Sequence, residues 1–196
     1  SENMIYYVDT IDKLNDAVKL MNDLVGSNVG EEVIIGLDCE WIMNDTKVSV
    51  LQLQVLSCTF IIHLSLIGWK MTENLEQFMN RPGFFFTGSN VKGDCTRLFK
   101  YNQDSITDSM RVKSGAFRTV DLKLYAKRMR IIPNRFSFTL SRMAKYFFDY
   151  DMDKGDVRVS NWRERLSPSQ IRYASIDVKM SRDVYFEILK HSSKSN

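Results

Sequence analysis

The stretch Val33-Ile34-Ile35-Gly36-Leu37-Asp38-Cys39-Glu40-Trp41 decides the fold of this chain. It is short, apolar and rich in β-branched residues, which predicts a buried strand. Because alternate residues of a strand share a face, Asp38 and Glu40 project together, while Leu37 and Cys39 point into the core. Two neighbouring carboxylates at the end of a buried strand repel each other, and a divalent cation is the simplest compensation. The alternative is that the strand ends at Asp38 and both acids are solvated.

The segments around this strand predict a sheet covered by helices. Further strands are predicted at 47–55, 59–64, 84–87 and 118–122, and helices at 11–25, 73–79, 90–101, 122–130, 138–148 and 168–189. The last helix has a clear start, because Ser167 and Gln170 can form a capping box around Pro168. This order of elements predicts an α/β fold with a mixed, mostly parallel five-stranded sheet flanked by helices.

Length and composition favour one globular domain. The 196 residues, 44% of them hydrophobic, suit a single core, which we place at about 33–190, with a disordered tail at 191–196. The three cysteines are odd in number and widely spaced, which disfavours a zinc site or a disulfide framework and favours a reducing intracellular compartment. We expect no membrane association, because no apolar stretch is long enough to span a bilayer and no signal peptide is recognisable.

Charge is distributed unevenly along the chain. Segment 118–145 holds eight basic residues and one acid, so its net charge is +7. The whole chain has a net charge of +3, and the residues outside this segment therefore carry −4. A basic stretch beside an acidic remainder is typical of a metal-using nucleic-acid enzyme. The alternative is a solvated helix face that happens to be basic.

A third acid, Asp94, lies in the helix predicted at 90–101. It follows Val91 by three residues and precedes Leu98 by four, so it falls on the apolar stripe that should face the sheet. An unpaired acid there is costly. One alternative is that the register of the predicted helix is wrong, so that Asp94 does not face the sheet. The other is that Asp94 pairs with Arg97 or Lys92. The glycine before Asp94 also suggests a close approach by backbone or ligand.

A fourth acid lies on the last predicted helix. Asp177 shares the apolar stripe with Ala174 and Val178, and Tyr173 lies one turn earlier on the same face. The alternative is a tyrosine–aspartate pair on the surface.

Taken together, the motifs resemble those of the DEDDy branch of the DnaQ-like 3′→5′ exonucleases, most closely the Werner-type exonuclease domains. The matching residues, over about 33–185, are Leu37-Asp38-Cys39-Glu40-Trp41, then Val91-Lys92-Gly93-Asp94 with Leu98, then Tyr173-Ala174 with Asp177. Two departures, Ser175 in place of a usual alanine and a displaced segment 162–167, bear on substrate preference.

The resemblance implies an RNase H-like fold and a 3′→5′ exonuclease that removes nucleotides from DNA or RNA by two-metal-ion hydrolysis. It implies that two Mg²⁺ or Mn²⁺ ions are held by Asp38, Glu40, Asp94 and Asp177. Tyr173 completes the catalytic set. Its reference pKa of about 10 suits it to orienting the attacking water rather than accepting a proton.

The expected partners are a single strand or the 3′ end of a duplex, together with other domains or proteins of a processing complex. We expect an intracellular protein, nuclear rather than cytoplasmic. The competing hypothesis is a catalytically silent nucleic-acid-binding or interaction module of a larger protein. The residues that we expect to contact substrate are Trp41, Asn90, Arg128, Arg130, Arg135 and Lys154. Phe136, Phe138 and Tyr146 could stack on bases, although at least one of the two phenylalanines should be core.

Overall fold

The computed structural model describes residues 2–27, 30–69, 71–101, 117–133, 137–153 and 155–194. Its centre is a six-stranded sheet in the order β1-β4-β3-β2-β5-β6. The strands are β1 (Met4–Val8), β2 (Val33–Glu40), β3 (Val50–Val55), β4 (Cys58–Ile62), β5 (Phe84–Gly88) and β6 (Arg118–Asp121). β3 runs antiparallel to both β2 and β4, whereas the pairs β1–β4, β2–β5 and β5–β6 are parallel. The mixed, mostly parallel α/β architecture is therefore confirmed.

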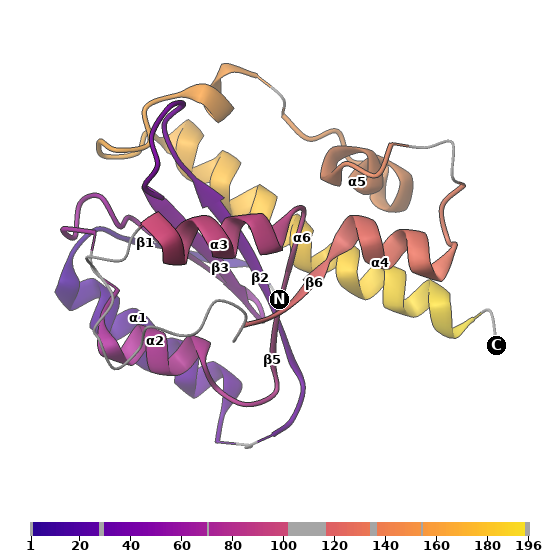
Figure 1. The fold of residues 1–196 in the computed structure, drawn as a ribbon, viewed down its shortest axis with the longest axis horizontal. Helices are drawn as coiled ribbons and strands as arrows, with labels where there is room; N and C mark the ends of the chain where they lie inside the picture. Colours follow the sequence, from indigo (N-terminus) through magenta and orange to yellow (C-terminus); the bar gives the residue numbers. More distant parts are fainter. Residues whose placement is uncertain are drawn as a thin grey trace.

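Helices cover both faces of the sheet (Figure 1). They are α1 (Ile11–Val25), α2 (Glu73–Met79), α3 (Val91–Tyr101), α4 (Leu122–Met129), α5 (Leu140–Phe148) and α6 (Pro168–Ser193), with a 3₁₀ turn, η3, at Asp156–Val159. α1, α2 and α3 build the larger core with the sheet, and α6 lies against its other face. α4 and α5 pack on the C-terminal half of α6 in a second cluster.

The expectation of five strands was wrong, because β1 adds a sixth at the sheet edge. Only the last residue of β1, Val8, is buried, so its sequence lacks the strong apolar pattern of an inner strand. Leu14 and Met21 of α1 are fully buried in the main core. The core therefore begins well before residue 33.

Most predicted helices lie where they were expected, and the exception is the end of α6. Its capping box is confirmed, since Ser167 and Gln170 exchange side-chain and backbone hydrogen bonds. The helix continues to Ser193, although the tail was expected to be disordered from residue 191. The reason is packing, because the His191 ring lies 5.4 Å from the Phe147 ring on α5. Residues 195–196 of the expected tail lie outside the described residues.

All three cysteines are buried and free. Within the described ranges, no helix has both the length and the apolar character needed to cross a bilayer.

Candidate active site

The end of β2 supplies the first two carboxylates, as the sequence predicts. Leu37 and Cys39 are buried in the main core, and Asp38 and Glu40 project from the opposite face. The neighbouring strand β3 pairs in register with this end, so that Gln52 lies opposite Asp38. β2 is an inner strand, in which β5 pairs with Val33–Gly36 and β3 pairs with Gly36–Glu40, so the end that carries the two acids is hydrogen-bonded to β3.

Asp94 enters from α3, on the face that packs against the sheet. It is only 5% exposed, and its Oδ2 atom is buried without a hydrogen-bond partner. The adjacent Gly93 is favoured by crowding, since a Cβ there would lie 2.6 Å from the Asn90 side-chain nitrogen. The close approach at Gly93 is therefore made by the side chain of Asn90, and not by backbone or ligand as the sequence suggested.

Asp177 enters from α6, which packs directly on β2. The carboxylates of Asp38, Glu40 and Asp177 supply oxygen atoms that all lie within 4.8 Å of one another. Two segments separated by most of the chain thus meet in one acidic cluster. Asp38 and Asp177 remain partly accessible to solvent, so the cluster is open on one side.

Burial raises the pKa of every carboxyl group in the cluster, and neighbouring carboxylates raise the pKa values of Asp38, Glu40 and Asp177 further. Burial raises the pKa of Asp177 to about 8, with a further contribution from the charge of Asp38. Burial raises the pKa of Asp94 to about 7, although hydrogen bonds from Asp38 and the Cys39 amide act in the opposite direction. The pKa values of Asp38 and Glu40 are also raised, first by burial and then by neighbouring carboxylates.

Tyr173 lies one turn before Asp177 and interacts with it. Its hydroxyl donates to the Asp177 carboxylate, which favours the charged form of that acid. Burial and the surrounding acids raise the pKa of Tyr173 further above its ordinary value. Tyr173 is thus a neutral donor at pH 7, able to orient a molecule and unable to serve as a base. Its ring packs against buried Trp162, with ring centroids 6.0 Å apart.

Two supporting contacts were not predicted from the sequence. The Gln52 side-chain amide donates to Glu40 over 3.4 Å, and the Cys39 amide donates to Asp38 over 2.9 Å. Gln52 is fully buried between Leu51 and Leu53. A polar residue within such an apolar run was the signal that could have identified it.

The expected substrate contacts are dispersed. Trp41 follows Glu40 directly, and the Arg97 guanidinium lies over its ring at 4.2 Å. Asn90 is exposed immediately before α3. Arg128 and Arg130 are exposed at the C-terminal end of α4. Among the described residues, neither arginine contacts a carboxylate of the acidic cluster. Arg135 and Lys154 lie outside the described residues.

The basic segment is only partly available to a ligand. Lys145 forms ion pairs with Asp149 and Asp151, at 2.8 and 3.1 Å. Phe138 is 6% exposed and belongs to the core, as expected of at least one phenylalanine, and Phe136 lies outside the described part of the chain. Tyr146 remains 47% exposed.

This donor set suits hard divalent cations. All of the candidate ligands are carboxylate oxygens, which Mg²⁺ and Mn²⁺ prefer. The raised pKa values show that the acids are poorly compensated without a cation, and the unpartnered Oδ2 atom of Asp94 provides a free ligand atom. The residues therefore fit a metal centre.

Comparisons with known proteins identify the family of this chain. A 3′→5′ exonuclease of Drosophila grimshawi is 29% identical over 163 residues, which cover 80% of this chain and 47% of that protein. The chain spans about half the length of the curated relatives that it matches.

Two solved structures share the fold. Escherichia coli RNase D, an exoribonuclease involved in structured RNA processing, superposes with a TM-score of 0.71 at 17% identity, covering 97% of this chain and 46% of that one. The Aedes aegypti Nibbler EXO domain gives the same TM-score at 18% identity, and the match covers 98% of this chain and 90% of that domain. The family model described as 3′-5′ exonuclease matches residues 5–192. This chain therefore belongs to the 3′-5′ exonuclease family.

Proposed function

We propose that this domain hydrolyses the terminal phosphodiester bond at the 3′ end of a nucleic-acid strand with the help of two divalent cations. The observation that supports this most directly is the meeting of three carboxylates, Asp38, Glu40 and Asp177, within 4.8 Å, with Asp94 beside Asp38. Buried like charges are costly, and their convergence is expected where they bind a cation.

Each acid has a distinct role in this proposal. Asp38 interacts both with Asp94 and with the cluster of Glu40 and Asp177, so it would contribute to both cation sites. Glu40 and Asp177 would complete one site, and Asp94 would hold the second. When bound, the Mg²⁺ or Mn²⁺ ions neutralise phosphate charge and make a water molecule nucleophilic near neutral pH.

The remaining polar groups orient the reactants. The Tyr173 hydroxyl, held by Asp177, is placed to position the attacking water, because it stays protonated at pH 7. Gln52 fixes the Glu40 carboxylate and the Cys39 amide fixes that of Asp38. Trp41, Asn90, Arg128 and Arg130 remain candidates for holding the strand upstream of the cleaved bond.

Oligonucleotide digestion tests this function. With 5′-labelled linear DNA and RNA strands and Mn²⁺, we expect a ladder of products shortened from the 3′ end, and no cleavage of circular strands. Excess EDTA should abolish the ladder. A nuclease acting on circles, or one fully active in EDTA, contradicts the proposal, and binding without shortening supports a silent module.

Two substitutions complete this experiment. Asp38→Ala should eliminate turnover while the circular dichroism spectrum is retained. Asp183→Asn is the matched control, since Asp183 lies on the same helix as Asp177 but forms an ion pair with Lys179. Its turnover should remain near that of the wild type.

A further inference from the structure

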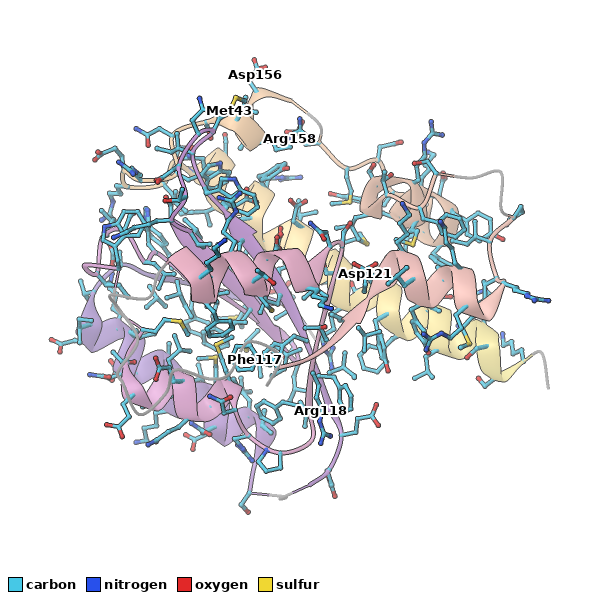
Figure 2. All side chains as sticks on the ribbon, viewed as in Figure 1. Met43, Phe117, Arg118, Asp121, Asp156 and Arg158 are labelled. Atoms are coloured by element: carbon cyan, nitrogen blue, oxygen red, sulfur yellow. The ribbon has the colours of Figure 1, made fainter. Side chains whose placement is uncertain are left out.

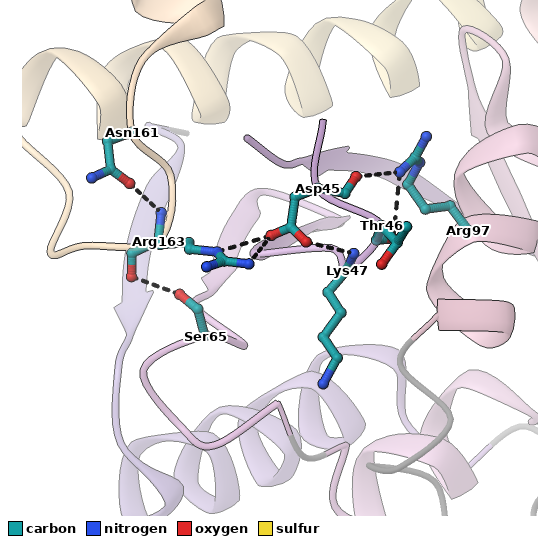
Figure 3. A network of polar contacts seen from close by, with 7 residues as sticks. All are labelled: Asp45, Thr46, Lys47, Ser65, Arg97, Asn161 and Arg163. Atoms are coloured by element: carbon teal, nitrogen blue, oxygen red, sulfur yellow. Dashed lines mark hydrogen bonds and ion pairs between the residues drawn. The ribbon is translucent and has the colours of Figure 1, made fainter. Parts of the chain in front are cut away.

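The loop 41–49, which joins β2 to β3, is held by arginines from two other elements (Figure 3). Arg97 of α3 donates to the carbonyl oxygens of Asp45 and Thr46, over 2.9 and 3.4 Å. The same guanidinium covers the ring of Trp41. One side of the loop is therefore fastened to the helix that carries Asp94.

Arg163 fastens the other side of this loop. Its Nε and Nη2 atoms donate to Asp45 Oδ2 over 2.8 and 2.5 Å, and the Lys47 amide donates to Oδ1 over 3.3 Å. The Arg163 backbone is itself fixed, since its carbonyl accepts from Ser65 and its amide donates to Asn161. Burial raises the pKa of Asp45, but the bonds from Arg163 and Lys47 outweigh it, so the pKa ends below its ordinary value.

This ion pair joins two segments that adjoin elements of the proposed site in the sequence. The loop starts directly after Glu40, and the segment that contains Arg163 ends at Ser167, the N-cap of the helix that carries Tyr173. Met43 of the loop and Arg158 of η3 lie toward the same end of the molecule (Figure 2). The loop and the approach to α6 thus form one side of the structure, and Asp45 is the side chain that joins them.

We propose that Asp45 is a positioning residue for the metal centre. Its pairing with Arg163 fixes the loop against the segment before α6, and so holds Glu40 at the distance from Asp177 that cation binding requires. This role rests on the proposed function. Partly exposed ion pairs add little to global stability, whereas small displacements of a ligand are costly to a preorganised site. The effect should therefore appear in metal affinity rather than in folding.

Mn²⁺ binding, followed by the electron paramagnetic resonance signal of the free ion, tests this role without relying on catalysis. Asp45→Ala should raise the Mn²⁺ concentration for half-saturation about fivefold, with little change in melting temperature. Asp45→Asn, which keeps the side-chain volume and an acceptor for the Lys47 amide, should give a smaller rise and guards against misfolding of the alanine variant.

Arg165→Ala is the matched control. Arg165 lies in the same segment and forms an ion pair with Asp9 at 2.9 Å, but Asp9 follows β1 and does not belong to the loop. Its half-saturation should stay within twofold of the wild type. The double variant Asp45→Ala/Arg163→Ala should bind Mn²⁺ no more weakly than either single variant, since each single substitution already removes the same ion pair.

The outcomes separate the two proposals. If the wild type binds Mn²⁺ and Asp45→Ala behaves like Arg165→Ala, the positioning role is overturned and the proposed function stands. If the wild type binds no Mn²⁺, the proposed function is overturned together with it. Additive losses in the double variant also contradict the pairing.

Discussion

A Cβ atom built on Gly36 would lie 2.6 Å from the backbone carbonyl oxygen of Val178. The backbone of α6 therefore lies directly on β2, at a distance that no larger side chain allows. Asp177 precedes Val178, and Asp38 lies two residues beyond Gly36 on the same face of the strand. This approach of helix to strand is what brings the two motifs together.

Gly36→Ala should therefore affect both stability and activity. The methyl group meets backbone rather than a flexible side chain, so α6 must shift, and we expect a loss of about 1–3 kcal/mol in the free energy of unfolding. Urea denaturation measures this loss, and turnover should fall with it. Gly155→Ala is the control, because its nearest neighbour is a side-chain oxygen of Asp153 at 3.0 Å, in an exposed loop. Equal stability of the two variants would refute this account of the packing.

Tyr173→Phe should slow hydrolysis about 10²-fold or more and change oligonucleotide affinity little. The substitution keeps the packing on Trp162 and removes only the hydroxyl, which orients the water in the proposed function. Single-turnover rates at saturating enzyme measure the effect. Tyr185→Phe, a buried tyrosine on the same helix, should retain the wild-type rate. A Tyr173→Phe variant as fast as Tyr185→Phe would show that the hydroxyl has no part in the reaction.

Without metal, the domain should lose stability as the pH rises. The folded pKa of Asp177, about 8, lies above its ordinary value of 3.8. Below about pH 4 both states bind the proton and the stabilisation is complete. Between pH 4 and 8 only the folded state retains the proton, so the stabilisation declines with pH and is lost above about pH 8.

Melting temperatures of the wild type and of Asp177→Asn, recorded in EDTA from pH 4 to 8, isolate this effect. As the pH rises, the melting temperature of the wild type should fall progressively relative to that of the variant. Mn²⁺ should reduce this fall by binding the charged carboxylates. A constant difference across this range would mean that Asp177 ionises with an ordinary pKa.

Arg128→Ala/Arg130→Ala should weaken binding to single strands and make it less dependent on salt. For every phosphate that the variant no longer neutralises, the slope of log affinity against log salt should become shallower by about 0.7. Binding across a salt series in Ca²⁺ measures this slope. Lys19→Ala, which removes an exposed charge from α1, should leave it unchanged. If the double variant keeps the wild-type slope, the strand is held elsewhere.

Much of the fold was predictable, because its signals are local. The apolar run of β2, with Asp38 and Glu40 at its end, follows from the two-residue period of a strand. The start of α6 follows from a capping box that spans only Ser167 to Gln170. β1 was missed, since an edge strand buries few side chains and its pattern is correspondingly weak.

The sequence by itself determined which residues are acidic, which elements carry them and which face of each element they occupy, because these properties depend on neighbours within one or two turns. Only the tertiary structure decided that carboxylate oxygens of Asp38, Glu40 and Asp177 lie within 4.8 Å of one another, and that Asp45 pairs with Arg163. The same holds for the close packing of the α6 backbone on Gly36. These contacts join segments separated by most of the chain. Their distances depend on how the helices pack on the sheet, and no local pattern specifies that packing.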